Sequence, residues 1–287
     1  MPHFVPQEFQ YRLGWRAQGA RPGAHMTRTP GGVADFRGYA NFLDHPDPRR
    51  IDVRATLGSI PRRLMVRSYH ERGAITVYAI VDLSASMSFA GHSDKRMLAA
   101  DVAASVAWSA TRGGDAFGLM ACDDTIRLEL LQAPNRRRWV AEEVMTRLLS
   151  CERRRAVRAT ALPMVAEHLQ RARALVFLIS DFHFDDTLLR TTLESLSHHD
   201  VVPVVLWDLA EYQDLPSWGW ARVRDMENGS EQSLFLRPAL AERIRHVYAE
   251  RRLTLAAICR RMGTRVPFFL EERFHAEHLT RHMMETC

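Results

Sequence analysis

Three short apolar runs, separated by segments with helical periodicity, constrain the fold of this chain more than any other feature. The runs read AITVYAIVD from Ala74, ALVFLISD from Ala174 and VVPVVLWD from Val201. Strands that are apolar throughout are typical of parallel sheets covered on both faces. After the first run an apolar residue recurs at every fourth position from Leu98 to Ala110, as on an amphipathic helix. This alternation predicts an α/β fold with a doubly wound, mainly parallel, Rossmann-like sheet.

The predicted α/β domain covers residues 73–217. Residues 1–72 contain Gly and Pro clusters with short extended pieces, and they form a predicted N-terminal extension. Residues 218–287 are predicted to hold a hairpin, with Asn228-Gly229 at its turn, followed by a long and a short helix. Inside the α/β domain we also expect strands at 115–123 and 125–131 and helices at 139–149 and 161–173.

Charge and composition narrow the function classes. The formal net charge is +5, and Lys95 is the only lysine, so nearly all basic charge is arginine. This indicates either a surface for acidic partners or arginines on solvated helix faces; aromatic residues do not alternate with them as in a specific nucleic-acid binder. No cysteine belongs to a CxxC pair, the first residues do not resemble a signal peptide, and no apolar run is long enough for a membrane span. The sequence therefore predicts a cytoplasmic protein without a membrane span.

Oxygen-bearing side chains follow two of the apolar runs. Asp82, Ser84 and Ser86 come directly after the first run, Asp181 ends the second, and Thr160 closes the loop before a predicted helix. In open α/β sheets ligands bind outside the carboxyl ends of the strands. Two carboxylates and three hydroxyls are hard ligands that suit Mg²⁺ or Mn²⁺, and Ca²⁺ less well. The alternative is structural: a helix N-cap at Asp82, Ser84 or Thr160, and a strand-end turn at Asp181.

An enzymatic reading also starts from these carboxylates. A metal-dependent phosphohydrolase or nuclease could use Asp82 and Asp181, with Asp123 and Asp124 in the nuclease, although that pair also suits a hairpin turn. A dehalogenase-like phosphatase needs a second Asp where Ser84 stands. The serines have no evident His partner that would activate them, and no P-loop motif occurs.

Asp82, Ser84 and Ser86 resemble the DxSxS motif of the metal-ion-dependent adhesion site in von Willebrand factor A domains, and Thr160 and Asp181 match that family's loop Thr and strand-end Asp. The resemblance implies that the two serines bind a cation directly, and that Thr160 does so directly or through water. It further implies that the two aspartates act mainly through water, and that a partner's carboxylate completes the octahedron. Arg153, Arg154 and Arg155 precede Thr160 and could either steer such an acidic partner or form a solvated loop.

The N-terminal extension carries a second resemblance. Gly32, Asp35-Phe36, the segment DPRRID at 47–52 and the basic stretch from Arg62 to Arg67 are similar to a bacterial domain-of-unknown-function family that accompanies MoxR-type AAA+ ATPases. This chain departs from many members in lacking N-terminal membrane helices and in having Val53 where Trp is usual. The resemblance implies a non-enzymatic, metal-dependent adaptor of a MoxR-type ATPase that grips an acidic residue of a client protein. Similarity to the A-domain proteins of methanol-oxidation gene clusters implies a role in the maturation of a quinoprotein dehydrogenase.

Overall fold

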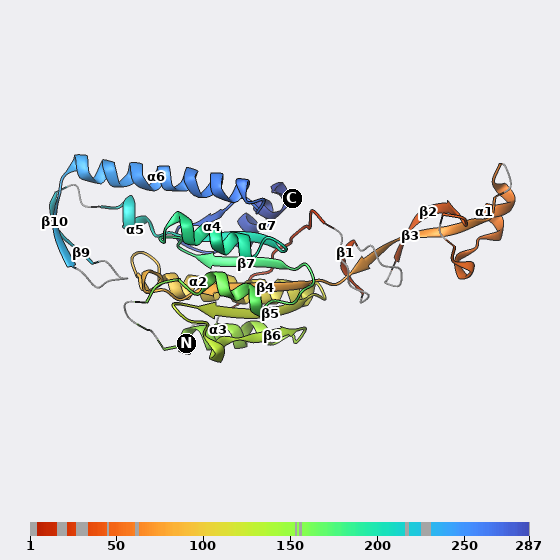
Figure 1. Ribbon diagram of the computed structural model, residues 1–287, viewed down its shortest axis with the longest axis horizontal. Helices are drawn as coiled ribbons and strands as arrows, with labels where there is room; N and C mark the ends of the chain where they lie inside the picture. Colours follow the sequence, from red (N-terminus) through yellow and green to blue (C-terminus); the bar gives the residue numbers. More distant parts are fainter. Residues whose placement is uncertain are drawn as a thin grey trace. The chain divides into compact units, whose positions relative to one another are not determined.

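The computed structural model describes residues 5–15, 22–26, 34–44, 46–60, 63–152, 154, 157–215, 218–224 and 231–286. The chain divides into two compact units, one made of Met1–Arg12 with Thr76–Cys287 and the other of Leu13–Ile75 (Figure 1). The larger unit contains both the predicted α/β domain and the predicted C-terminal hairpin and helices.

A six-stranded sheet forms the centre of the larger unit, in the order β11-β8-β7-β4-β5-β6. All neighbours in it are parallel except β6, which runs antiparallel to β5. The predicted α/β fold with a mainly parallel sheet is confirmed. The strands are β4 (Thr76–Asp82), β5 (Ala116–Cys122), β6 (Gln132–Asn135), β7 (Leu175–Ser180), β8 (Asp200–Leu206) and β11 (Phe268–Leu270).

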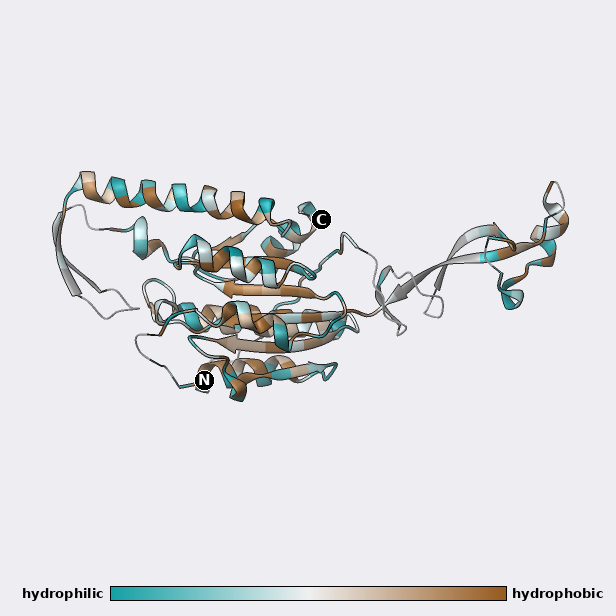
Figure 2. Ribbon diagram, in the orientation of Figure 1, coloured by the Kyte–Doolittle hydropathy of each residue, from teal (hydrophilic) through white to brown (hydrophobic). Residues whose placement is uncertain are grey.

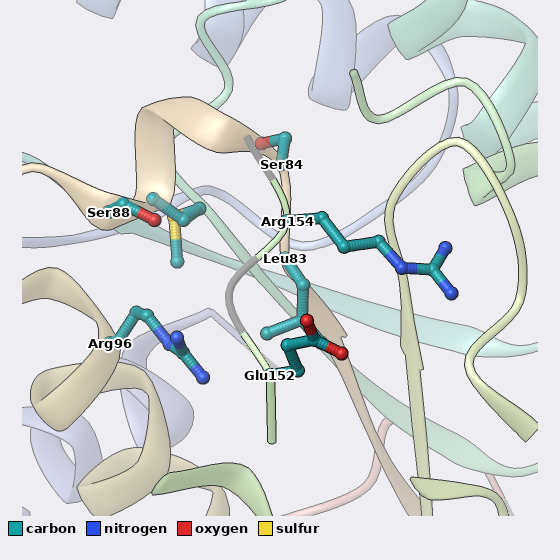
Figure 3. A pocket seen from close by; sticks show the side chains of 7 residues that line it. Leu83, Ser84, Ser88, Arg96, Glu152 and Arg154 are labelled. Carbon is teal, nitrogen blue, oxygen red and sulfur yellow. The ribbon is translucent and has the colours of Figure 1, made fainter. Parts of the chain in front are cut away.

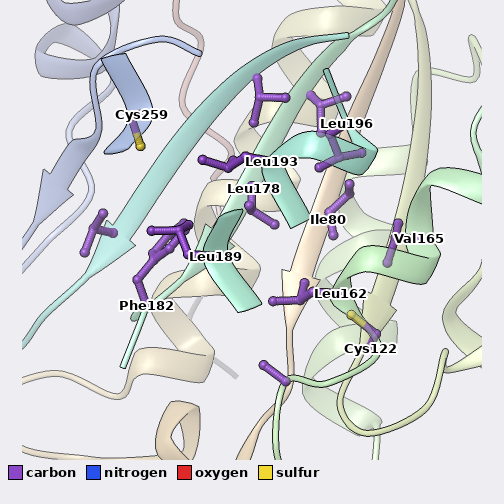
Figure 4. Close-up of a cluster of buried hydrophobic side chains, with 14 of the residues drawn as sticks. Ile80, Cys122, Leu162, Val165, Leu178, Phe182, Leu189, Leu193, Leu196 and Cys259 are labelled. Carbon is purple, nitrogen blue, oxygen red and sulfur yellow. The ribbon is translucent and has the colours of Figure 1, made fainter. Parts of the chain in front are cut away.

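Helices cover both faces of this sheet, which explains why its central strands are apolar throughout (Figure 2). On one face α2 packs against β4, β5 and α3. On the other, side chains of η4, α4 and α6 join Tyr78, Ile80 and Leu178 in a buried cluster (Figure 4). The helices of this unit are η2 (Ala85–Ser88), α2 (Lys95–Arg112), η3 (Leu128–Leu130), α3 (Val140–Ser150), η4 (Leu162–His168), α4 (Asp186–Ser195), α5 (Leu209–Tyr212), α6 (Pro238–Arg261) and α7 (Ala276–Glu285).

Two predicted elements differ from the structure. Residues 125–131, which we expected as a strand, form a bend and the 3-10 turn η3. Only Ile126 bridges to Cys122 at the end of β5 before Arg127 binds Asp123, and regular pairing with β5 resumes at Gln132. The helix expected at 161–173 is the shorter 3-10 helix η4, which ends where Leu169 turns extended.

A two-stranded antiparallel hairpin, β9 (Gly219–Arg224) and β10 (Glu231–Leu236), precedes α6 as predicted. Its turn at Asn228-Gly229 lies outside the described residues. No helix in the described part of the chain is long and apolar enough to cross a membrane.

The smaller unit is a three-stranded antiparallel sheet in the order β1-β3-β2. Asp52 begins its one α-helix among the described residues, accepting hydrogen bonds from Ala55 N and from Arg67 Nε. Gly32 and Arg62 of the family resemblance lie outside the described residues. The elements are β1 (Pro22–Met26), β2 (Ala34–Asn41), η1 (Pro48–Arg50), α1 (Val53–Gly58) and β3 (Met65–Gly73).

Candidate functional site

The carboxyl ends of β4 and β7 lie next to each other in the central sheet. The two strands pair in parallel, so that Asp82, the last residue of β4, and Asp181, which follows β7, reach the same edge. Both side chains are buried. The topology thus brings together the two carboxylates that the sequence predicted at a common site.

The loop after β4 is held by the carboxylate of Asp82. Its Oδ1 accepts a hydrogen bond from Ser84 N at 2.8 Å, and its Oδ2 accepts one from Ser180 Oγ at 2.6 Å. The hydroxyl oxygens of Ser84 and Ser86 lie 3.2 Å apart, and Ser86 is partly exposed. Ser84 is the N-cap residue of η2, but its side chain makes no capping hydrogen bond, so a capping role does not account for its hydroxyl.

Asp181 is bound from the interior by a cation of the protein itself. Lys95 Nζ lies 3.0 Å from Asp181 Oδ2, and the lysine side chain is 1% exposed. The other oxygen of Asp181 accepts a hydrogen bond from His183 N. Phe182, between these residues, has a φ of 55°, a left-handed conformation that is costly for a bulky side chain. The strand-end turn predicted for Asp181 therefore exists, and it also carries a buried ion pair.

A second carboxylate completes the surroundings of Lys95. Glu211 Oε1 lies 2.6 Å from Lys95 Nζ, while Glu211 Oε2 accepts a hydrogen bond from Asp208 N. Asp208 and Glu211 form a capping box at the start of α5. The carboxylate of Asp208 also accepts bonds from His92 N and Ser93 N, which fixes the loop that leads into α2. A Cβ on Gly91 would lie 2.7 Å from that carboxylate, so this approach requires glycine.

The ionisable groups at this edge are shifted in different directions. Burial, followed by the charge of Asp181, raises the pKa of Asp82 to about 7. Burial acts in the same sense on Asp181, but the positive charges of His183 and Lys95 outweigh it and lower the pKa of Asp181. For Lys95, burial would lower the pKa, yet the charges of Asp181 and Glu211 raise it. Lys95 and Asp181 are therefore an ionised buried pair.

Thr160 lies in an exposed turn before η4, and no helix is capped by its side chain, because the N-cap position belongs to Ala161. The segment before Thr160 does approach the site, because Val157 O accepts a hydrogen bond from Ala85 N in the loop that carries Ser84 and Ser86. Arg154 and Ser84 line one small hollow of about 10 Å³, room for about one water molecule (Figure 3). Arg153 and Arg155 lie outside the described residues.

Asp123 is not available to the site. It is buried, accepts hydrogen bonds from Thr125 N and Oγ1, and is paired with Arg127 Nη1 at 3.0 Å. Its neighbour Asp124 is 49% exposed. The hairpin-turn interpretation of this pair is thus the one that the contacts support, rather than a nuclease set with Asp82 and Asp181.

The donor set at the edge fits a hard divalent cation. Adjacent ligands of an octahedral Mg²⁺ lie about 3 Å apart, given bonds of about 2.1 Å, and the Ser84 and Ser86 oxygens are separated by 3.2 Å. Within the described ranges no three His, Cys, Asp or Glu side chains are grouped so that they could hold a metal. A cation here would therefore depend on the two hydroxyls, on water and on one or two carboxylates.

Sequence reasoning missed three of the residues that shape this edge: Lys95, Asp208 and Glu211. One signal was present, because Lys95 is the single lysine in a chain that otherwise uses arginine. Arginine presents a broad planar fork, whereas lysine is a compact point charge. The lone lysine therefore marked a position that differs from the other basic residues of the chain.

The chain is similar to one described protein family and, more distantly, to solved structures. A family model described as "Protein of unknown function DUF58" matches residues 46–254. The conserved hypothetical protein BatB from Bacteroides thetaiotaomicron is 9% identical with a TM-score of 0.45, and the alignment covers 74% of this chain and 98% of that one. An aerotolerance-related membrane protein from Bacteroides fragilis is 12% identical with a TM-score of 0.40, with the same coverage of 74% and 98%. No curated protein sequence matches the chain.

Proposed function

The chain belongs to the family described as proteins of unknown function DUF58, and on this premise we propose that it is a non-enzymatic protein-interaction module of the von Willebrand factor A type. The observation that carries the proposal is the convergence of Asp82, Ser84, Ser86 and Asp181 at one edge of the sheet. Hydroxyls that lie beside buried carboxylates and are open to solvent at Ser86 suit recognition rather than turnover, since among the described residues no histidine or lysine is hydrogen-bonded to either serine.

We propose further that recognition depends on Mg²⁺ or Mn²⁺. Ser84 and Ser86 would hold the ion directly, with Asp82 and Asp181 acting through water and Thr160 closing the site. Bound there, the ion would offer an open coordination position to an acidic side chain of the partner. The protein's own contribution is rigidity: Ser180 fixes Asp82, and Lys95 fixes Asp181.

The family resemblance supplies the partners in this proposal. They are a MoxR-type AAA+ ATPase and a client that presents a Glu or Asp, with a quinoprotein dehydrogenase as the client implied by methanol-oxidation clusters. Arg154, which is exposed beside Ser84, supports an acidic client because its charge would attract one.

Calorimetric titration with Mg²⁺ and Mn²⁺ tests the proposal. We expect binding by the wild-type protein and its loss in Asp82→Ala, while Asp124→Ala, which alters an exposed carboxylate outside the set, binds as the wild type does. A metal-dependent pull-down of the ATPase should follow the same order. If Asp82→Ala kept both metal and partner binding, the mechanism would be wrong. Mg²⁺-dependent hydrolysis of p-nitrophenyl phosphate that Asp82→Ala abolished would instead favour a phosphohydrolase.

A further inference from the structure

Lys95 places a fixed positive charge inside the site that the proposed function assigns to a divalent cation. Its ammonium lies between Asp181 Oδ2 and Glu211 Oε1, at 3.0 and 2.6 Å. The side chain is 1% exposed, so this charge is screened little by water or salt. One of the two strand-end carboxylates is therefore neutralised before any ion arrives.

The ammonium cannot easily swing away from this position. Lys95 is the first residue of α2, whose start is fixed by the side chain of Asp94. The loop ahead of it is tied to Asp208, and Asp208 holds Glu211 through their capping box. Movement of Lys95 would leave Asp181 and Glu211 buried without a counter-charge, which is strongly unfavourable.

Charge balance at the edge follows from this arrangement. Asp181 and Glu211 together carry two negative charges, and the ammonium of Lys95, which is hydrogen-bonded to both, carries one positive charge. Asp82 is then the only carboxylate of the set whose hydrogen bonds all come from neutral donors, Ser84 N and Ser180 Oγ. Affinity for hard divalent ions depends on the number of charged ligands in the site. With Asp82 included, the three carboxylates and Lys95 carry a net charge of −2 instead of −3, so Lys95 weakens the attraction of the edge for a divalent ion.

We infer that Lys95 acts as a built-in competitor of the divalent cation, so that the free protein binds the ion weakly and takes it up together with an acidic group supplied by the partner. This inference rests on the proposed function and concerns the regulation of the same site. The partner's carboxylate contributes the charge that Lys95 has withdrawn. Ion and partner then bind cooperatively, and neither occupies the site well alone.

Two variants change the charge at this position in opposite directions. Lys95→Met removes the positive charge and keeps a long side chain. Glu211→Gln removes a negative charge while it retains an amide oxygen for Lys95 and a residue type that still suits the capping box. Arg96→Met is the matched control, because Arg96 is the neighbouring basic residue, is also buried and donates hydrogen bonds to the carbonyl oxygens of Leu148 and Cys151 rather than to Asp181 or Glu211.

Mn²⁺ binding is measured through the electron paramagnetic resonance signal of the free ion. Each titration is carried out with and without acetate, which stands in for the carboxylate of a partner. We expect acetate to strengthen binding to the wild type. Lys95→Met should bind Mn²⁺ roughly tenfold more tightly without acetate and lose the acetate effect. Glu211→Gln should bind several-fold more weakly, and Arg96→Met should stay within about twofold of the wild type.

The outcomes separate the inference from the proposed function. Tight Mn²⁺ binding by the wild type without acetate, equal in Lys95→Met and Glu211→Gln, would overturn the role of Lys95 while leaving the metal site in place. Absence of binding in every variant, with acetate present, would overturn the metal site itself and the inference with it. If Lys95→Met does not fold, as judged by circular dichroism, Glu211→Gln decides: weaker binding supports the inference, and unchanged binding overturns it.

Discussion

The ends of β4 and β7 carry two carboxylates that are equally buried and behave in opposite ways. The side chains of Asp82 and Asp181 are both fully shielded from solvent, and the strands that carry them are direct neighbours. The pKa of Asp82 is nevertheless raised to about 7, whereas that of Asp181 is lowered. Burial is the largest influence on both groups, so the difference must come from what else each group contacts.

The contacts give the reason. Asp82 is bound by a backbone amide and a hydroxyl, which stabilise its charge only in part. Asp181 is influenced by the positive charge of His183 and then by the ammonium of Lys95, which it faces directly. An opposite charge within a few ångströms can outweigh desolvation, and neutral donors here do not. Asp181 is therefore paired with a cation of the protein itself, whereas Asp82 has no such partner among its hydrogen-bond donors and would be stabilised by an added cation.

The largest effect is expected from removing the charge that creates the contrast. Lys95→Met should lower the free energy of unfolding at pH 7 by about 3–5 kcal/mol, because Asp181 and Glu211 would stay buried without a counter-charge. Urea denaturation in EDTA measures this change. The double variant Lys95→Met/Asp181→Asn should recover part of the loss, and a loss in Lys95→Met below about 1 kcal/mol would contradict the buried ion pair.

Asp82→Asn should act in the opposite direction. Because the folded pKa of Asp82, about 7, lies above its ordinary value of 3.8, the folded protein binds more protons between these values. Stability is therefore lost as the pH rises from about 4 to 7. In EDTA the variant should be about 2 kcal/mol more stable than the wild type at pH 8, with the difference vanishing near pH 4.

Asp181→Asn is the matched comparison for Asp82→Asn. The folded pKa of Asp181 lies below 3.8, so its contribution to stability is present above that value and is lost as the pH falls through the folded pKa. Asp181→Asn should therefore destabilise the protein at pH 7, the reverse of Asp82→Asn. Equal signs for the two variants would remove the basis of the contrast.

Asp101, on the same helix as Lys95, tests whether burial alone gives the behaviour of Asp82. Burial raises its pKa to about 6, and its carboxylate accepts a hydrogen bond from the neutral hydroxyl of Ser105. Stability should again fall as the pH rises from 3.8 to about 6. Because Asp101 is partly exposed, we expect Asp101→Asn to gain only about 1 kcal/mol at pH 7.5 in thermal or urea unfolding. A destabilised variant would indicate an ionic role for this carboxylate.

The elements that form the sheet edge could be predicted because their signals are local. Apolar runs predict β4, β7 and β8, and an apolar residue at every fourth position predicts α2. Once the strands are known to be parallel, their carboxyl ends place Asp82 and Asp181 at the same edge. Residues 125–131 misled the same reasoning, since the pattern TIRLELL suits a strand until Arg127 is drawn to Asp123. β11 was missed because three residues, FFL, carry too little pattern to predict a strand.

The charge at the site could not be predicted, because it depends on contacts between distant positions. Lys95 is hydrogen-bonded to Asp181 and Glu211, which lie 86 and 116 residues further along the chain, and only the order of the strands brings them together. Asp82 and Asp181 look equivalent in the sequence, since each follows an apolar strand. What distinguishes them is the positive charge of His183 and of Lys95 near Asp181. Lys95 lies on a helix between the two strands in sequence, and no spacing rule assigns it to one carboxylate rather than the other.

The smallest effect concerns a half-buried histidine, and it extends the comparison from acidic to basic side chains. Burial, and then the charges of His198 and Arg173, lower the pKa of His199 to about 4 from 6.5. Its neutral ring accepts a hydrogen bond from Ala174 N through Nδ1. The unfolded chain binds more protons between pH 4 and 6.5, so stability falls as the pH is lowered through this window.

His199→Asn keeps a hydrogen-bond acceptor but does not titrate. The variant should therefore be more stable than the wild type at pH 5, by less than about 1 kcal/mol because the ring is partly exposed. Unfolding midpoints at pH 5 and pH 8 measure this, and an equal effect at both values would show that the ring acts through packing and not through its charge.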